Sequence, residues 1–170
     1  IQNLVISAYG YYWKKRRFGG IFEQQLVKFK NRESYSYNDW AEYQTVELRK
    51  ILVHAFDNVP LYHEKYKKAG IKRTELERMD LDSLNKLPVL TKNELRQYGT
   101  TLLMSTMNGP RGAFLSSSGS SGTPTKIFFS KEMHQKWSAA YEARVRNWAG
   151  IDRHNSRGMI GGRRIVTNGI

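Results

Sequence analysis

The fold of this chain is indicated first by the stretch Gly112-Ala113-Phe114-Leu115-Ser116-Ser117-Ser118-Gly119-Ser120-Ser121-Gly122-Thr123-Pro124-Thr125-Lys126-Ile127-Phe128-Phe129. Its apolar ends, residues 112–115 and 127–129, predict two short strands. The residues between them are mostly serine, threonine and glycine, followed by a lysine. Glycine lets backbone N–H groups turn inward around an anion, hydroxyls add donors, and lysine adds a positive charge. We predict a cradle for nucleotide phosphates. A flexible Gly/Ser linker is the alternative, which Pro124 and the immediate return to apolar residues disfavour.

The loop matches neither common glycine-rich nucleotide motif. The position five residues after Gly119 is Pro124, where a Walker A loop has glycine, and the G-x-G-x-x-G spacing is absent. Residues 118–124 instead resemble the signature Ser-Gly-(Ser/Thr)-(Ser/Thr)-Gly-x-Pro of adenylate-forming (AMP-binding) enzymes. Lys126 comes one residue later than the lysine of many members. This spacing resembles the phenylacetate–CoA ligase branch and its capsular-polysaccharide-biosynthesis (CapK-like) relatives.

Further segments resemble the same branch, in the family's order. Residues 52–62 look like its "His-Ala-aromatic-x-Asn-Val-Pro-x-Tyr" segment, and residues 84–95 look like its "Leu-Pro-x-Leu-Thr-Lys" segment. Three glycine-containing stretches are similar to CapK-like members, namely Tyr9-Gly10-Tyr11, Phe18-Gly19-Gly20 and Gly161-Gly162-Arg163. The resemblance therefore covers most of the chain.

The resemblance implies an ATP-dependent ligase that activates a carboxylic acid as an acyl-adenylate and releases pyrophosphate. The acyl group then passes to coenzyme A or, in capsule-associated members, to a sugar or another nucleophile. ATP, Mg²⁺ and coenzyme A are the implied cofactors and co-substrates. Lys126 is the implied catalytic residue. Because adjacent strand residues face opposite ways, Thr125 and not Lys126 could face the phosphates, which leaves the role of Lys126 open. The implied ATP-binding residues are Ser118, Gly119, Ser120, Ser121, Gly122 and Thr123.

The predicted fold class is α/β. We expect a helical N-terminal region over residues 1–100 and the beginning of an α/β nucleotide-binding subdomain over residues 101–170, incomplete relative to the adenylate-forming large domain. The family's later aromatic-Gly-x-Thr-Glu segment and lid lysine are not found after Lys126. Residues 98–102 are superficially similar to the aromatic-Gly-x-Thr-Glu segment, but they precede the hydroxyl-rich loop and have leucine where that segment has glutamate. The chain is thus expected to be an N-terminal fragment that is inactive alone.

Charge and composition allow two other kinds of function. The net charge is +13 and is concentrated at the ends, with seven Lys/Arg against two acids in residues 1–35 and eight against three in residues 131–170. Such a field attracts polyanions, so a non-catalytic anion- or nucleic-acid-binding module is an alternative. No nucleic-acid motif is recognised, and we expect no nucleic-acid partner. Cysteine is absent, which permits the expected cytoplasmic location.

The first residues predict a helix with an apolar stripe. The stripe comprises Ile1, Leu4, Val5, Ala8, Tyr9, Tyr12 and Trp13, and a basic run at residues 14–17 follows it. We expect this helix to dock on the protein core, as such stripes usually do. Peripheral contact with an anionic membrane through residues 1–17 is the alternative, and it is the second rival function.

Local signals predict the remaining elements. Ser36 with Asp39, Thr91 with Glu94, and Ser130 are expected to cap helices that end before Pro60, at Gly99 and at Gly150. Helices over residues 21–32 and 61–69 and a strand over residues 157–166 complete the expectation. The four histidines have no metal-ligand spacing, so no metal site is predicted. The predicted buried residues of the helix from Tyr37 are Trp40, Tyr43, Leu48, Ile51, Leu52, Ala55 and Phe56. In the helix after Ser130, we expect Trp137, Ala140, Ala143 and Trp148 to lie partly inward and Lys131, Glu132, Gln135 and Arg146 outward.

Overall fold

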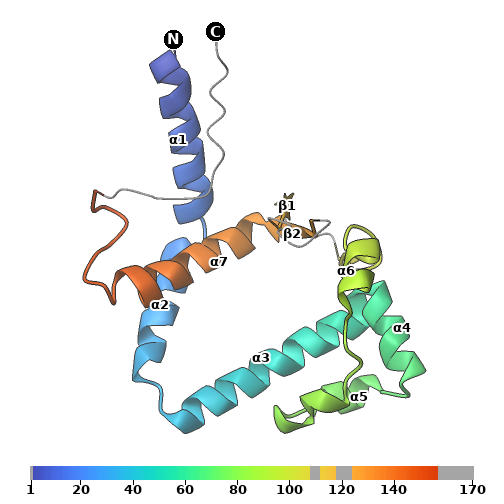
Figure 1. Cartoon of the computed structure of the whole chain (residues 1–170). Helices are drawn as coiled ribbons and strands as arrows, with labels where there is room; N and C mark the ends of the chain where they lie inside the picture. The colour runs from blue at the N-terminus through green and yellow to red at the C-terminus, as the bar shows by residue number, and fades with distance from the viewer. Residues whose placement is uncertain (1, 108–111, 118–123, 157–170) are drawn as a thin grey trace.

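The computed structural model describes residues 2–107, 112–117 and 124–156. Within these ranges the chain is mainly helical with one small antiparallel sheet (Figure 1). The predicted strand at residues 157–166 lies outside the described residues. The elements are, in order, α1 (Gln2–Phe18), α2 (Phe22–Asn31), η1 (Arg32–Ser34), α3 (Tyr37–Asn58), α4 (Pro60–Lys68), α5 (Arg73–Leu76), η2 (Asp82–Lys86), α6 (Lys92–Tyr98), β1 (Gly112–Ser116), β2 (Lys126–Ser130), α7 (Lys131–Tyr141) and the π-helical turn η3 (Glu142–Arg146).

Two separate apolar clusters hold these elements together. One joins α2 to α7 and η3 through Phe22, Leu26, Ala139 and Ala143. The other joins α3, α4 and α5, and its buried members are Leu52, Ala55, Tyr66 and Leu76. The long helix α3 runs from the neighbourhood of α2 to α4, and the hairpin β1–β2 leads back to α7, so the elements surround an opening (Figure 1). The division of the chain at residue 100 stays a prediction.

The predicted helix caps are confirmed. The hydroxyl of Ser36 accepts a hydrogen bond from the Asp39 N–H at 3.2 Å, while the Asp39 carboxylate accepts from the Ser36 N–H at 2.8 Å. The bond that the Ser36 hydroxyl donates to the Asp39 carboxylate at 2.7 Å, together with the one from the Ser36 N–H, lowers the pKa of Asp39. Thr91 and Glu94 form the same reciprocal box, and Ser130 caps α7. Each cap uses residues three apart, so it forms wherever the local backbone allows.

The predicted orientation of α7 is partly wrong. Gln135, expected outward, is buried, and its Oε1 accepts a hydrogen bond from the Ile21 N–H at 3.2 Å. This contact occurs at the turn between α1 and α2, where Gly20 has φ of +55° and a Cβ would lie 2.6 Å from Gln135 Oε1. The side of α7 that carries Gln135 therefore packs on this turn. Trp137 and Trp148, expected to lie partly inward, are exposed.

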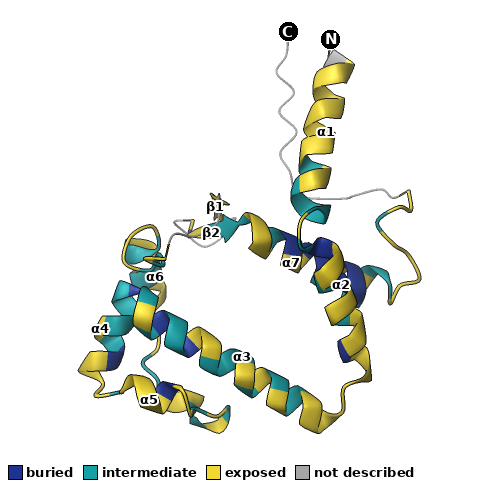
Figure 2. Ribbon diagram, turned by 180° about the vertical axis from the view of Figure 1, so that it is seen from behind, coloured by how far each residue is buried: buried dark blue, intermediate teal, exposed yellow. Residues whose placement is uncertain are grey.

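The predicted burial of α3 is correct for part of its apolar face. Leu52 and Ala55 are buried, whereas Ile51, one helical turn before Ala55, is exposed. Trp40, Tyr43, Leu48 and Phe56 are half-buried. Figure 2 shows intermediate and exposed residues alternating along α3. The second apolar cluster lies at the C-terminal end of α3, so only that end has a fully covered face.

The expectation that α1 docks on the protein core is correct only for its C-terminal end. Leu4, Val5, Tyr9 and Tyr12 are exposed, and the helix projects from the rest of the molecule (Figure 2). Its C-terminal end alone is anchored. The Phe18 ring packs edge-on against Phe22 of α2 with centroids 5.0 Å apart, and Trp13 packs edge-on against His134 of α7. Of the helices in the described ranges, none has the length and hydropathy needed to cross a bilayer.

Candidate functional site

The predicted hairpin is confirmed. β1 and β2 pair in antiparallel register, from Gly112 opposite Ser130 to Ser116 opposite Lys126. Beyond the last pair, the Ser117 N–H donates to the Thr125 carbonyl oxygen at 2.9 Å, and the Thr125 N–H donates to the Ser117 hydroxyl at 3.0 Å. These two bonds join the ends of the loop. The loop residues Ser118, Gly119, Ser120, Ser121, Gly122 and Thr123 lie outside the described residues.

Thr125 and Lys126 take up different environments at the start of β2. Thr125 is buried, with 7% of its surface exposed, and Lys126 is exposed. This contrast follows from the strand, where consecutive side chains point to opposite faces. Within the described ranges Lys126 takes part in no ion pair. Its ammonium group is therefore available to an anion that comes from outside those ranges.

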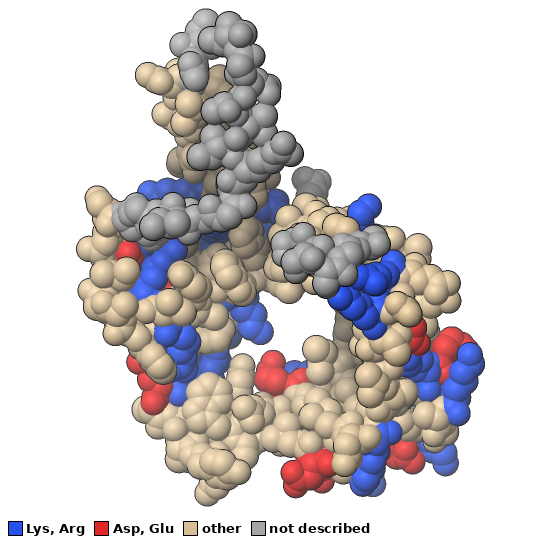
Figure 3. Space-filling view, viewed as in Figure 1, with Lys and Arg blue, Asp and Glu red and all other residues tan. Residues whose placement is uncertain are grey.

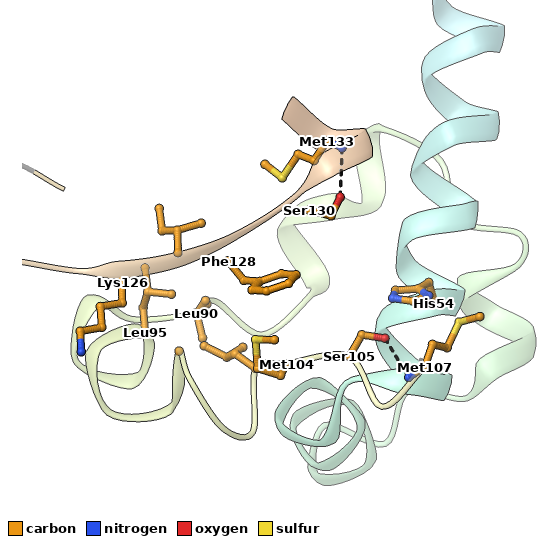
Figure 4. Close-up of a pocket in the computed structure, with 13 residues that line it drawn as sticks. His54, Leu90, Leu95, Met104, Ser105, Met107, Lys126, Phe128, Ser130 and Met133 are labelled. Carbon is orange, nitrogen blue, oxygen red and sulfur yellow. Dashed lines mark hydrogen bonds between the residues drawn. The ribbon is translucent and has the colours of Figure 1, made fainter. Parts of the chain in front are cut away.

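A cavity of about 650 Å³ lies beside β2. Its size falls within the range of small-molecule sites in proteins. Figure 4 shows Lys126 and His54 at opposite sides of the view, with leucine, methionine and phenylalanine side chains between them. The lining residues are His54, Leu90, Leu95, Gly99, Leu103, Met104, Ser105, Met107, Lys126, Ile127, Phe128, Ser130 and Met133. The site is thus an apolar cavity with a cation at its edge.

The end of α3 positions one wall of this cavity. The Asn58 carbonyl oxygen accepts hydrogen bonds from the N–H of Thr106 at 2.7 Å and from its hydroxyl at 3.2 Å. The Leu61 N–H donates to the Leu102 carbonyl oxygen at 3.0 Å. The Asn58 side-chain amide also lies 3.3 Å from Nδ1 of His54. These bonds hold residues 102–107 next to His54, which explains why Met104 and Met107 reach the cavity.

The helix α6 positions the second wall. Lys65 on α4 donates to the Glu94 carboxylate at 2.6 Å and to the Val89 carbonyl oxygen at 2.8 Å. The bond from Lys65, with those from Thr91, lowers the pKa of Glu94 to about 2. This arrangement fixes Leu90 and Leu95 at the cavity. A Cβ at Gly99 would lie 3.3 Å from the Lys126 carbonyl oxygen, so the end of α6 closely approaches β2.

Three segments that are distant in the sequence therefore meet at one cavity. His54 belongs to the segment 52–62, Leu90 and Leu95 belong to the segment 84–95, and Lys126 follows the hydroxyl-rich loop. The sequence resemblance singled out all three segments without indicating that they meet. The sequence analysis missed Met104, Met107 and Met133, because isolated methionines belong to no motif. Only their tertiary contacts reveal them.

His63 and His134 occupy structural positions. His63 Nδ1 lies 2.8 Å from the Phe56 carbonyl oxygen, and His134 packs edge-on against Trp13. Burial, with the nearby charges of Arg17 and Arg16, lowers the pKa of His134. Across residues 2–107, 112–117 and 124–156, no group of three or more histidine or carboxylate side chains could hold a metal ion. We assign Mg²⁺ no ligand in this part of the chain.

Comparison with known proteins gives two distant relatives. No protein-family model matches the chain. The chain is 29% identical over 124 residues to phenylacetate-coenzyme A ligase of Pseudomonas putida, an alignment of 67% of this chain and 26% of the relative. It is 29% identical over 106 residues to phenylacetate-coenzyme A ligase of Escherichia coli (strain K12), covering 62% of this chain and 24% of the relative. The chain spans about a quarter of the length of these curated relatives. It is therefore distantly related to part of the phenylacetate-coenzyme A ligases.

Proposed function

We propose that this chain is the part of an ATP-dependent ligase that binds the phosphates of ATP. The whole ligase activates a carboxylic acid and transfers the acyl group to coenzyme A. The observation that carries the proposal is the convergence of His54, Leu90, Leu95 and Lys126 on one cavity, directly beside the strand that follows the hydroxyl-rich loop. The distant relationship to phenylacetate-coenzyme A ligases supports the same class of reaction.

The proposed reaction has two steps. A carboxylate oxygen of the acid attacks the α-phosphorus of ATP, the bond to the β-phosphate oxygen breaks, and acyl-adenylate and pyrophosphate form. The thiolate of coenzyme A then attacks the acyl carbonyl carbon, the C–O bond of the acyl–phosphate anhydride breaks, and AMP leaves with the electron pair of that bond. Transfer of the acyl group to a sugar or another nucleophile, as in capsule-associated members of the family, stays a prediction for this chain.

The loop would contribute hydrogen-bond donors to the departing pyrophosphate. Negative charge grows on that group as the phosphorus–oxygen bond breaks, so donors held around it stabilise the transition state more than the ground state. In this proposal Ser118, Ser120, Ser121 and Thr123 supply hydroxyls, while Gly119 and Gly122 shape the backbone. One preorganised donor of this kind lowers a barrier by about 3 kcal/mol.

The described residues around the loop support this role. The two hydrogen bonds between Ser117 and Thr125 bring the loop ends together, which reduces the reordering that phosphate binding requires. Lys126 adds a positive charge at the edge of the apolar cavity. An apolar acid could place its hydrocarbon part in that cavity with its carboxylate near Lys126. ATP and coenzyme A are the co-substrates in this proposal, and Mg²⁺ is the accompanying metal ion.

ATP binding to the 170-residue chain tests whether it binds the phosphates of ATP. We expect calorimetry to show that Lys126→Ala weakens ATP binding by about tenfold or more, the usual effect of losing a hydrogen bond to a charged group. Lys136→Ala is the matched control, because Lys136 is exposed on α7 and forms no ion pair within the described ranges. Equal ATP affinities for the two variants would remove Lys126 from the site.

Carboxylate-dependent exchange between ATP and labelled pyrophosphate tests the chemistry in the whole protein that contains this chain. We expect exchange with at least one acid of a panel that includes phenylacetate, and its loss in the Ser120→Ala/Ser121→Ala variant. ATP binding without exchange for any acid would contradict the ligase proposal. Binding that falls steeply with salt and does not distinguish ATP from other polyanions would favour a non-catalytic anion-binding module instead.

A further inference from the structure

A small cavity at the C-terminal end of α1 is lined largely by basic side chains. Its volume is about 250 Å³, and the residues that line it are Tyr12, Lys15, Arg16, Gly112 and Lys131. Three of these five residues are cations and none is acidic. Figure 3 shows basic side chains gathered where α1 meets the rest of the molecule. A cavity lined by charges of one sign attracts ions of the other sign, so this one attracts anions.

One contact between α1 and α7 brings the three cations together. The Trp13 ring of α1 packs edge-on against His134 of α7, with the ring centroids 6.1 Å apart. The guanidinium of Arg16 lies 5.8 Å from the centre of the same Trp13 ring. Lys131 is three residues before His134, so both lie on the same side of α7. The contact therefore places the end of α1 against the start of α7, where Lys15, Arg16 and Lys131 line one cavity.

The three cations have no carboxylate partner within the described ranges. Lys15, Arg16 and Lys131 take part in none of the ion pairs found there. Glu132 follows Lys131 in the sequence, but it does not line the cavity and forms no ion pair within those ranges. The residues of the sequence outside those ranges include arginine but neither aspartate nor glutamate. The positive charge of the cavity is therefore available to an anionic ligand.

The donors around the cavity suit a phosphate group better than a carboxylate. Arg16 donates a hydrogen bond to the Tyr12 hydroxyl oxygen at 3.4 Å, so the proton of that hydroxyl is left for another acceptor. The buried Nε of Arg16 has no hydrogen-bond partner within the described ranges. A phosphate monoester carries nearly two negative charges and three strong acceptor oxygens, whereas a carboxylate carries one charge and two oxygens. A phosphate monoester therefore satisfies more of these donors.

The cavity is separate from the hydroxyl-rich loop. Gly112 is the first residue of β1, and the loop follows the other end of this strand, after Ser116. At about 3.4 Å per residue, Gly112 and Ser116 are about 14 Å apart along the strand. The volume of about 250 Å³ is also below the roughly 300–1,000 Å³ of sites for drug-sized molecules. The cavity therefore has room for a phosphate group and not for a whole nucleotide.

We propose that this cavity is a second anion site, which binds the phosphate monoester group of a ligand through Lys15, Arg16 and Lys131. The Tyr12 hydroxyl supplies a further donor. The group has two possible sources, a small free phosphate and the 3′-phosphate of coenzyme A. The second source rests on the proposed function, whereas binding of free phosphate does not. Neither depends on ATP binding at the hairpin.

A titration of the 170-residue chain with inorganic phosphate, followed by the NMR signals of the backbone amides, tests the proposal. The titration is made at about 0.1 M salt, where charges on the surface are screened beyond about 10 Å. We expect the amide signals of Gly112 and Lys131 to shift in a saturable way. The variant Lys15→Ala/Lys131→Ala should weaken phosphate binding by about tenfold or more, the effect of losing a hydrogen bond to a charged group.

The variant Lys14→Ala/Lys136→Ala is the matched control. It removes the same charge from exposed positions on the same two helices, and neither lysine lines the cavity. Because salt screens distant charges, this control should weaken phosphate binding by less than about threefold. Circular dichroism establishes that each variant is folded, and a double variant that is not folded is replaced by Lys15→Ala, with Lys14→Ala as its control.

Coenzyme A and 3′-dephospho-coenzyme A identify the source of the phosphate group. If coenzyme A is the source, it should bind about tenfold or more tightly than the dephospho form, and the Lys15→Ala/Lys131→Ala variant should lose this difference. If the source is a small free phosphate, inorganic phosphate should bind at Gly112 and Lys131, and the two coenzymes should bind equally.

Three results would overturn the proposal. The first is the absence of a saturable shift at Gly112 and Lys131, and shifts confined to Ser117 and Thr125 would then support the hydroxyl-rich loop as the phosphate site without a second one. The second is an equal loss of phosphate binding in the cavity and control variants, which would indicate diffuse charge attraction. The third is binding of acetate as tight as that of phosphate, which would show that the cavity does not select a phosphate group.

Discussion

Replacement of Glu142 by alanine should strongly destabilise the body formed by α2, α7 and η3. The Glu142 side chain is 1% exposed. One carboxylate oxygen accepts a hydrogen bond from Arg146 NH1 at 2.6 Å, and the other accepts from the Arg153 N–H at 2.6 Å. The carboxylate thus joins η3 to the segment that follows it. Alanine removes both acceptors and leaves the two donors without partners.

The contacts set the expected magnitude. Removing one partner of a buried ion pair costs about 3–5 kcal/mol, largely because the other charge stays buried. The Arg146 side chain keeps 14% of its surface exposed, and its guanidinium lies 5.0 Å from the centre of the Tyr141 ring. Water and the ring compensate part of the lost interaction. We therefore expect the free energy of unfolding to fall by about 3 kcal/mol, a large part of the 5–15 kcal/mol typical of a folded protein.

Urea denaturation followed by circular dichroism measures this loss. Glu142→Gln should recover part of it, because the amide oxygen can still accept from the Arg153 N–H while the amide NH₂ cannot accept from Arg146. Arg146→Ala and the double variant complete a mutant cycle, in which the two effects should be clearly less than additive. Glu42→Ala, at an exposed position on α3, is the control and should unfold close to the wild type. A Glu142→Ala protein within 0.5 kcal/mol of the wild type, or additive effects in the cycle, would refute the reasoning.

Two further predictions concern a helix cap and a histidine. Thr91→Ala removes the hydroxyl that accepts from the Glu94 N–H at 3.2 Å, so the free energy of unfolding should fall by about 1 kcal/mol in urea denaturation. Thr91→Ser should restore it, and an equal loss in both variants would argue against the cap. Because the folded state lowers the pKa of His134 below its ordinary 6.5, the unfolded chain binds the proton more readily, and stability should decrease as the pH falls below about 6.5. His134→Gln should weaken this dependence between pH 7.5 and 5.5, and an unchanged slope would rule out His134 as its source.

Interactions within a few residues were accessible from the sequence. The caps at Ser36, Thr91 and Ser130 depend on side chains three positions from their partners, and the hairpin depends on two apolar runs that flank a polar loop. The cavity beside β2 was not accessible, because its walls come from α3, α6, β2 and the connection at residues 102–107. No local pattern records that these four segments meet.

The sequence by itself determined where the hairpin and the starts of the capped helices form, that charge is concentrated at both ends of the chain, and that a hydroxyl-rich loop precedes Lys126. Tertiary structure alone decided which faces these elements bury. Gln135 lies inside because the turn at Gly20 offers it a backbone N–H, whereas the apolar start of α1 stays exposed because no described element lies against it. The physical reason is that periodicity shows only that a face is apolar. Burial depends on a second surface, and the packing of distant residues brings that surface into place.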